Sequence, residues 1–592
     1  MTIAHLPNRP LPATLSVPRA AVPTAIDTGD AAVPSDSGPA LANLDNLPSL
    51  EFHFPGKDGS RLTGWAIYAE PVDKSNPLGP VRQVGDDDEG FSCIDDVARI
   101  GQIYLNDFER TGSPESAQKA REAIEFCLNL EDGKGLFYNF VEQDGRINKT
   151  GHTSFLGFTW WTARAFTALA QAERVLTDDP EFTARLGASL DRTLDRMTEH
   201  REKGEVHPNL EKTYQRLGIT PGTLLDDSGS ITALFALGLV QRVRSGKADE
   251  AQQKLLAEYG EALVKGRHDA DHPFLGNLHI NSLNDPQTVH LYGNNQVQAL
   301  CEAGVALDRP DFIASARLEA EHAYPQLLAS WMMPFAVSPS PEPFPQIAYS
   351  AECAVSNLQA LHKATGEKKF SLMAGLFGSW FGGANVSGQP VYHQPTGRAF
   401  DGVDPQGVSI NSGAESNAEA LLAMQALEGT PGAALLGATR TSDPQGIAVR
   451  SGSDFQPHGP ATAETRGLNG GVQRTIWKLE PDAELALPSP TSDPSWVTWH
   501  GPQGSQLEFQ GVEEKPGQVE FDSGTHFDVD GLPVGVTGLR NPGSETVWVE
   551  SLTERPATLT RRWTGQAGTV ELKVEGLGTR TTADDTFTLH QV

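Results

Sequence analysis

Apolar and polar positions repeat a helical pattern six times between residues 92 and 427. Each repeat begins with a small polar or acidic cluster and runs directly into an apolar, Ala/Leu-rich stretch. In the first repeat Ile94, Val97, Ala98, Gly101 and Leu105 recur at spacings of three, four and seven, which is one face of a helix. The six openings are SCIDDVARIGQIYL from Ser92, SFLGFTWWTARAFTAL from Ser154, LDDSGSITALFALGL from Leu225, YGNNQVQALCEAGVAL from Tyr292, IAYSAECAVSNLQAL from Ile347 and NSGAESNAEALLAMQAL from Asn411.

More polar helical segments alternate with these six. The segment PESAQKAREAIEFCLNL opens with Ser113 as a cap and Pro114 at the first helical position, and its apolar stripe is narrower. A helix pair of this kind buries its apolar face only by stacking on neighbouring pairs. We therefore expect a ring of six helical hairpins, which gathers the starts of all inner helices at one mouth.

The pattern changes at both ends of this helical region. Residues 1–45 are rich in Pro, Ala, Ser and Asp without periodicity, which predicts a disordered leader. After about residue 441, period-2 runs such as VQRTIWKL, WVTWH and TVELKVEGL alternate with Pro/Gly/Asp turns, which predicts an antiparallel β-sandwich. The predicted fold class is α+β multidomain, with a leader at 1–45, a helical toroid at 46–440 and a sandwich at 441–592.

Composition excludes several classes of protein. The 592 residues carry 46 basic and 76 acidic side chains, a net charge of −30, which disfavours a nucleic-acid partner. No run approaches the roughly 20 apolar residues of a membrane span, so no membrane partner is expected. The N-terminus lacks a continuous apolar segment of the secretory type, which indicates a cytoplasmic protein. The four cysteines lie in helical patterns without CxxC spacing and are interpreted as buried apolar residues.

The remaining candidate chemistry is that of carboxylates and aromatic rings. The sequence contains no GxxxxGK[ST], HExxH or GxSxG motif, and the run DDDEG from Asp86 lacks the spacing of a calcium loop. We therefore expect neither a cofactor nor a metal ion. Paired carboxylates in a concave site are what glycoside hydrolysis requires, and aromatic faces stack on sugar rings. An oligo- or polysaccharide is the expected substrate, while the oligomeric state is left open.

Four carboxylates are catalytic candidates: Asp96, Asp227, Glu352 and Glu415. Two acids have a competing interpretation, because the pairs Ser92–Asp95 and Ser412–Glu415 each fit a capping box. Asp96 is less well explained by capping. One residue of the Asp226–Asp227 pair is expected to cap the next helix, and Asp227 is the one favoured for a catalytic role. Glu352 lies in an otherwise apolar helix, so it is either desolvated and functional or faces solvent.

A second set of residues is expected to bind the substrate. Arg99 follows Asp95 by four residues and Asp96 by three, which predicts an ion pair within the helix or an arginine that tunes the acid. Trp160 and Trp161 cannot face the same way on a helix, so one is expected in the core and the other at a sugar. The substrate-binding candidates are Asp95, Arg99, His152, Trp160, Trp161, Tyr292, Asn294 and Tyr349.

At this point the chain resembles the six-hairpin, (α/α)6-toroid carbohydrate-active enzymes, over roughly residues 50–440. The stretch EGFSCIDDVARI is similar to the opening of helical-toroid modules, some of them fused to bacterial glycosyltransferases. The stretch GRAFDGVDPQGVSINSGAESNAEALLAM is similar to the closing inner helix of several toroids. The resemblance implies an (α/α)6 toroid with catalytic acids at the starts of inner helices and in the preceding loops, and thus a glycoside hydrolase.

Three alternatives stay open. A toroid followed by a sandwich also resembles polysaccharide lyases, in which Tyr, His and Arg or Asn act on a uronate; Tyr292, Tyr349, His152, Arg99 and Asn294 are the residues available. Sugar epimerases built on helical toroids, which rely on histidine pairs, rank below the lyase. A non-catalytic glycan-binding module of a polysaccharide system is the third alternative.

Overall fold

The computed structural model describes residues 40–591 except 269–275, 287, 331–335, 339–343, 441–447, 468–472, 494, 503, 513–517, 521–527, 533, 555–557, 567 and 576–586. Most of the predicted leader, up to residue 39, therefore lies outside the described residues. The last part of that segment runs into a short 3-10 helix, η1 (Leu44–Leu50), which packs on the helical core through Leu47 and Leu50.

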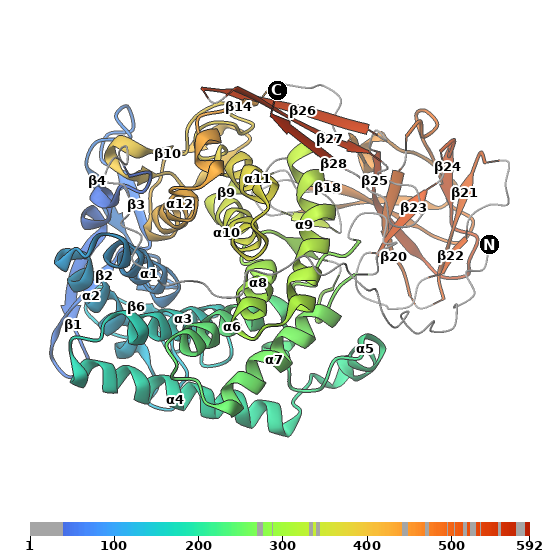
Figure 1. Cartoon of the computed structure of the whole chain (residues 1–592). Coiled ribbons are helices and arrows are strands. Elements are labelled where there is room, and N and C mark those ends of the chain that lie inside the picture. Colours follow the sequence, from blue (N-terminus) through green and yellow to red (C-terminus); the bar gives the residue numbers. More distant parts are fainter. Residues whose placement is uncertain are drawn as a thin grey trace.

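Six inner helices form a closed ring, seen nearly end-on in Figure 1. Each contacts the next along the chain, and the last contacts the first. Because each inner helix has neighbours on several sides, it is buried almost all round, whereas an outer helix buries only one stripe. The inner helices are α1 (Ile94–Thr111), α3 (Trp160–Val175), α6 (Gly229–Arg244), α8 (Gln296–Ala306), α10 (Ala348–Thr365) and α12 (Ala414–Leu427).

An outer layer of helices covers this ring. The outer helices are α2 (Pro114–Leu130), α4 (Pro180–Lys203), α7 (Glu250–Lys265), α9 (Pro310–Ser330) and α11 (Lys368–Gly378). The sixth outer position is a 3-10 helix, η5 (Pro431–Leu435), which packs on α11. The short helix α5 (Glu211–Leu217), in the loop before α6, was not expected from the sequence. This alternation of inner and outer helices fits the predicted toroid.

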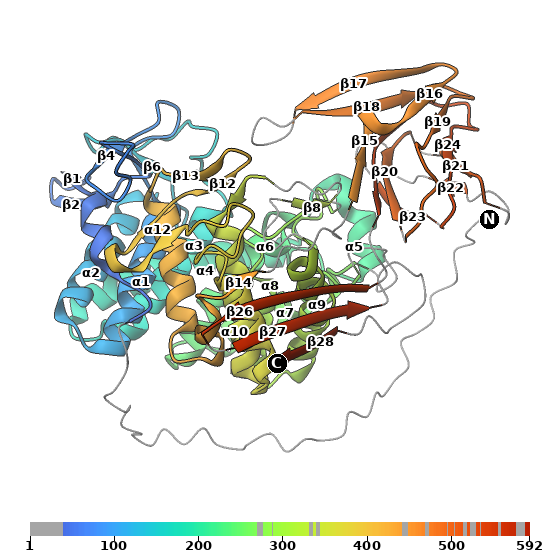
Figure 2. The ribbon, with the colours of Figure 1, turned by 90° about the horizontal axis from the view of Figure 1, so that it is seen from above.

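Short strands precede several inner helices and gather on one side of the ring. β5 (Ser92–Cys93) enters α1 and pairs with β6 (Phe140–Val141). β9 (Gln346–Ile347) enters α10 and pairs with β12 (Gly402–Asp404), which also pairs with β13 (Gly407–Ser409). In Figure 2, β6, β12 and β13 lie on the same side of the helices. The remaining short pairs are β1 (Glu51–Pro55) with β2 (Arg61–Trp65), β3 (Tyr68–Pro71) with β4 (Val81–Val84), and β7 (Val289–His290) with β8 (Ala336–Ser338).

The C-terminal strands form two separate structures, which differs from the single sandwich predicted for 441–592. Two antiparallel sheets enclose a core of their own around Trp499 and Leu507. The larger contains β15 (Ala448–Ser451), β17 (Ala461–Gly467), β18 (Gln473–Leu479), β20 (Ser495–His500), β23 (Asp528–Leu532) and β25 (Val547–Glu554). The smaller contains β16 (Gln456–His458), β19 (Glu484–Ala486), β21 (Gln506–Gln510), β22 (Gln518–Glu520) and β24 (Gly538–Arg540).

The other four strands belong to the helical part. β14 (Thr439–Arg440), β26 (Thr558–Gly565), β27 (Gly568–Glu575) and β28 (Phe587–Gln591) form one antiparallel sheet. This sheet packs against α9 and lies next to it in both views (Figures 1 and 2). The fully buried Trp563 shares the core of the helices, and the Arg561 Nε donates to the Ala329 carbonyl at 2.6 Å. Alternation in TVELKVEGL predicted the strand β27, but not which core it would cover.

Among the residues that the structure describes, no helix combines the length and the apolarity that crossing a bilayer requires.

The packing of β26 on α9 allows a test of whether the helical core and the core of the C-terminal sheets are separate. Replacing Trp563 by alanine deletes a fully buried side chain from the helical core and should lower the stability of that part by about 3–5 kcal/mol. Hydrogen exchange followed by mass spectrometry should then show faster exchange in α9. Trp499→Ala is the matched control, because Trp499 is equally buried but belongs to the separate core of the C-terminal sheets. Acceleration of α9 exchange by both variants would contradict two separate cores.

Candidate functional site

A pocket of about 490 Å³ opens where the inner helices begin, and we call it the mouth pocket. The first turns of α1, α3, α10 and α12 contribute to it, together with the strands and loops that enter them. Its lining combines five carboxyl groups with aromatic rings. The lining residues are Ile67, Tyr68, Glu89, Cys93, Asp95, Asp96, Asn139, Phe140, Thr153, Trp160, Trp161, Tyr292, Ile347, Tyr349, Asp401, Glu415 and Ser416.

The acids at the starts of α1 and α12 do not cap their helices. The N-cap of α1 is Cys93 and that of α12 is Gly413, and neither makes a side-chain capping bond. Ser92 instead donates its hydroxyl to the Trp65 carbonyl at 2.6 Å. The capping-box interpretation of Asp95 and Glu415 is therefore wrong, and both carboxylates are available to the pocket.

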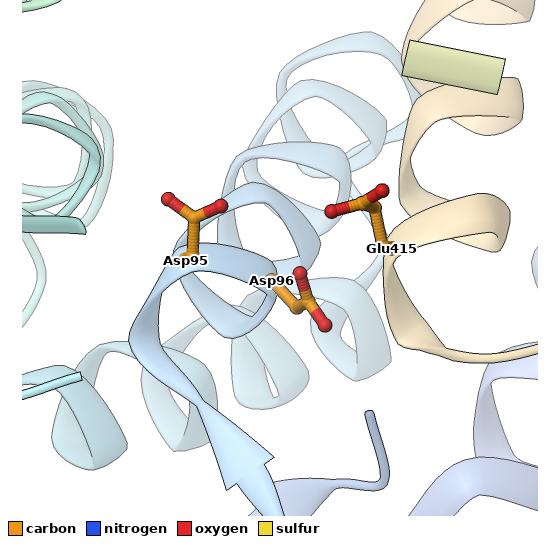
Figure 3. Close-up of side chains that lie close together, drawn as sticks. All are labelled: Asp95, Asp96 and Glu415. Atoms are coloured by element: carbon orange, nitrogen blue, oxygen red, sulfur yellow. The ribbon is translucent and has the colours of Figure 1, made fainter. Parts of the chain in front are cut away.

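Three carboxylates converge around one buried guanidinium group. Oxygens of Asp95, Asp96 and Glu415 lie within 4.8 Å of one another. Arg99 Nη2 donates to Asp96 Oδ1 at 2.8 Å, to Asp95 Oδ2 at 3.2 Å and to Glu415 Oε2 at 3.4 Å. Figure 3 shows Asp96 from α1 and Glu415 from α12 pointing toward each other, with Asp95 on the other side of the first turn of α1. We call these three residues the acid cluster.

The opposite edge of Arg99 contacts a fourth acid. Its Nη1 forms an ion pair with Glu419, one turn after Glu415 on α12, and the Glu419 side chain is completely buried. A buried carboxylate is tolerated only when a cation or hydrogen bonds compensate for its lost hydration. Arg99, itself only 4% exposed, supplies that compensation for the acid cluster and for Glu419 at once.

A second arginine and an aromatic ring complete the pocket floor. Arg164 Nη1, from α3, donates to Asp95 Oδ2 at 3.0 Å. The Tyr349 ring lies 4.9 Å from the Arg99 guanidinium carbon and 4.7 Å from that of Arg164, so both cations contact its π system. Asp95 is thus flanked by two cations, while its Oδ1 is buried without a hydrogen-bond partner among the described residues.

Burial gives the Asp96 carboxyl group a higher pKa than a free Asp has. Loss of hydration raises the pKa of Asp96 from 3.8 to about 7; Glu415 and Asp95 add to this rise, and Arg99 opposes it. The Glu415 side chain is 46% exposed, against 5% for Asp96. The two facing carboxyl groups therefore differ in exposure to water, and the buried one, Asp96, can hold a proton near neutral pH.

The oxygens of the acid cluster are of the type that binds Mg²⁺ or Ca²⁺. Here the Arg99 guanidinium already lies between them at hydrogen-bonding distance and supplies the compensating positive charge. For a metal ion to bind these oxygens, the Arg99 guanidinium would have to move out from between them.

The aromatic candidates occupy the wall of the pocket. Trp161 is 7% exposed, and its indole N–H donates to the Phe137 carbonyl at 2.9 Å. Trp160 is half-buried, and its ring lies directly against Gly293, where a Cβ would come within 2.2 Å of it. Tyr292 stacks in parallel on His290 with ring centroids 3.7 Å apart. One tryptophan is thus held in the core and the other borders open space.

Asp227, Asn294 and His152 do not line the mouth pocket. Asp227 is buried before α6, where it accepts from the Tyr214 hydroxyl at 2.7 Å and from the His207 N–H at 3.1 Å. Asn294 is buried between helices, and His152 is exposed on a loop. Ser228, not an Asp, caps α6, so the expectation that one of Asp226 and Asp227 caps that helix is wrong.

Glu352 lies below the pocket floor. It lines a second, polar space of about 430 Å³ along the ring axis, which we call the axial cavity, and its carboxylate accepts from the Ser356 hydroxyl at 2.5 Å. Burial raises its pKa. Tyr349 and the two guanidinium groups separate the axial cavity from the mouth pocket, since Tyr349 lines both spaces.

The structure also places residues in the site that were not singled out from the sequence. Asp401, in the loop before α12, lines the mouth pocket; burial raises its pKa, and it accepts from the Ser416 hydroxyl at 2.5 Å. Arg164 had a signal, because WWTARAF of α3 repeats the Ala-Arg of IDDVARI in α1 at nearly the same distance from the helix start. Glu419 follows Glu415 by one helical turn, and Glu89 lies in the DDDEG run, which was considered only as a calcium loop.

A Ser–His–Glu array elsewhere in the chain is structural. His279 Nε2 lies 3.0 Å from Ser315 Oγ, and its Nδ1 contacts Glu319. All three side chains are almost fully buried, and none lines the mouth pocket or the axial cavity. Buried in this way, the array joins the loop before α8 to α9.

Comparison with known proteins finds similar solved structures, and those named below are sugar-active enzymes. No family model matches the chain, and no curated protein matches it. Similar solved structures include a sugar epimerase from a ruminal bacterium (14% identity, 66% of this chain, 96% of that chain, TM-score 0.47) and the GH family 9 endoglucanase J30 (14%, 66%, 81%, 0.36). A GH76 α-mannanase of Bacteroides thetaiotaomicron is another (9%, 57%, 86%, 0.38). These TM-scores are below 0.5 and carry no weight for the chemistry; the similarity of EGFSCIDDVARI to glycosyltransferase-associated modules stays a prediction.

The free energy of unfolding can show how far Arg99 compensates the buried acids Asp96 and Glu419. Arg99→Met should leave Asp96 and Glu419 buried without a cation and cost about 3–5 kcal/mol at pH 8. The folded-state pKa of Asp96 already lies above the 3.8 of a free Asp, so ionising it costs stability as pH rises. The loss should therefore be smaller at pH 5. Denaturant unfolding at both pH values measures it.

Arg110→Met on the same helix is the matched control. Its side chain is 45% exposed and its ion pair with Asp107 is superficial, so it should cost at most about 1 kcal/mol. An Arg99→Met variant as stable as Arg110→Met at pH 8 would contradict the compensating role of Arg99.

Proposed function

We propose that the chain is a glycoside hydrolase that cleaves a glycosidic bond in the mouth pocket. The observation that carries this proposal is the facing pair Asp96 and Glu415, one carboxyl group buried with a pKa of about 7 and the other half-exposed. Two carboxyl groups with separated environments are the minimum machinery for this reaction. The half-buried Trp160 and the rings of Tyr292 and Tyr349 supply faces on which a sugar can stack.

In this proposal Asp96 is the general acid. Its protonated carboxyl group donates to the leaving glycosidic oxygen as the bond to the anomeric carbon breaks. Glu415, ionised beside Arg99, attacks the anomeric carbon from the opposite face. The resulting Asp96 carboxylate then takes a proton from water as that water displaces Glu415. Oxygens of the two groups lie within 4.8 Å of each other, which is shorter than the roughly 6.5–9.5 Å of inverting pairs and favours the closer arrangement that accompanies retention of configuration.

The lyase alternative is less well supported by the geometry. A uronate lyase needs a cation free to bind the sugar carboxylate, whereas Arg99 and Arg164 lie below the pocket floor and are bonded to Asp95. His152 does not line the mouth pocket, and Asn294 is buried elsewhere. An epimerase with a histidine pair is less well supported too, because the described residues that line the mouth pocket include no histidine.

Activity measurements distinguish these alternatives. Wild-type protein should release reducing ends from a neutral glycan in a mixed panel of neutral and uronate glycans, without the ultraviolet absorbance of an unsaturated uronate. Asp96→Asn and Glu415→Gln should each lower kcat/KM at least about 100-fold. Glu115→Gln, the same change at an exposed position on α2, should leave it unaltered. Absorbance rising together with reducing ends, or full activity in Asp96→Asn, would refute the carboxylate-pair mechanism.

The pKa of Asp96 predicts a pH dependence. The proton must be on Asp96 at the start of the reaction, so kcat/KM should fall as pH rises through about 7. A neighbouring acid whose charge raises this pKa also lines the pocket, so Asp95→Asn should shift the basic limb to lower pH. The pH–rate profiles of both proteins measure this shift. A basic limb that stays in place in Asp95→Asn would show that another group is being titrated.

A further inference from the structure

Two exposed aromatic side chains stand beside the mouth pocket. Tyr68 is 44% exposed and Phe155 is 49% exposed; they are the aromatic members among the exposed large hydrophobic residues of the described chain. Tyr68 lines the mouth pocket, and Phe155 packs edge-to-face on Trp161 with centroids 5.0 Å apart. Exposed rings that flank a polar pocket are placed to stack on sugar units that extend out of it.

A second hollow begins at the same rim. It measures about 760 Å³, is formed by the loops at 87–89 and 142–153, and we call it the loop hollow. Glu89 and Thr153 line both the mouth pocket and the loop hollow. Glu89 accepts from the Tyr68 hydroxyl at 3.0 Å and from Thr153 Oγ1 at 3.2 Å, which fixes this shared wall. The two spaces are therefore adjacent parts of one concave surface.

The charges around this surface select against anionic sugars. The loop hollow contains Asp87, Asp88, Glu89 and Glu142 against Arg146 and Lys149. Arg146 is already engaged, since its Nε donates to Asp144 Oδ2 at 2.8 Å. The mouth pocket adds the acid cluster, and the whole chain carries a charge of −30. A uronate would meet an excess of like charge in both spaces, whereas neutral hydroxyls find both donors and acceptors.

We propose that the mouth pocket, the Tyr68–Phe155 rim and the loop hollow form one extended subsite array for a neutral oligosaccharide. The sugar units beyond the cleaved bond stack on Phe155 and Tyr68 and then enter the loop hollow across Glu89 and Thr153. This inference rests on the proposed function for the position of the cleaved bond. The binding of a long neutral chain at this surface is a separate property and is tested separately.

Calorimetric titration of the full chain tests the array without any reliance on turnover. The probes are cello-, manno- and xylo-oligosaccharides from disaccharide to hexasaccharide, together with oligogalacturonides of the same lengths, added to the Asp96→Asn protein. At least one neutral series should bind more tightly with increasing length, while the oligogalacturonides should not. Phe155→Ala should weaken the hexasaccharide about 10-fold and the disaccharide much less.

Val305→Ala is the control, because Val305 is 50% exposed but lies at the far end of α8 from the mouth. It should leave every affinity unchanged. Affinity that does not rise with length in any neutral series, an equal effect of Phe155→Ala on short and long probes, or preferred binding of oligogalacturonides would overturn the array. Length-dependent binding without hydrolysis by the wild-type protein would retain the array and refute the proposed function instead.

Discussion

The chemistry of the mouth pocket depends on the compensation of buried negative charge by Arg99. One guanidinium group, 4% exposed, contacts Asp95, Asp96, Glu415 and Glu419, which come from the first and last inner helices. The ion pairs therefore join α1 to α12, where the ring closes. Such a network is costly to desolvate, and in a ring this rich in Ala and Leu an apolar filling would hold the helices together at least as well. Its presence is best explained by the pocket above it.

The same network sets different properties for neighbouring acids. Asp95 lies between two cations, Asp96 is buried and gains a proton near neutral pH, and Glu415 is half-exposed. These differences come from the direction in which each side chain points. Asp96 follows Asp95 by a single residue, yet the turn of α1 directs their side chains to opposite sides (Figure 3). A helix start thus places adjacent acids in unlike surroundings, which is what acid–base chemistry at one pH requires.

Helical periodicity predicted the six inner helices and their shared mouth because the pattern depends on local burial, which each helix repeats. It also brought Asp96, Glu415, Trp160 and Tyr349 into the candidate site. It could not separate Glu352 from them, since one turn along α10 decides between the mouth pocket and the axial cavity. The contacts of Asp227 and the packing of β26 on α9 were not predicted, for a related reason: the partner of a buried acid or of a strand's apolar face is set by tertiary packing, which is not written in the spacing.

The position of Tyr349 connects these observations. Its ring is held between Arg99 and Arg164 and forms the boundary between the mouth pocket and the polar axial cavity. Both cations are thereby kept below the floor, where they balance the acids without facing the substrate. A ligand in the mouth pocket meets carboxyl groups and aromatic rings, and the positive charge that stabilises those carboxyl groups is screened from it by the ring. That arrangement keeps the acids ionisable and at the same time leaves the pocket suited to neutral hydroxyl groups rather than to an anionic sugar.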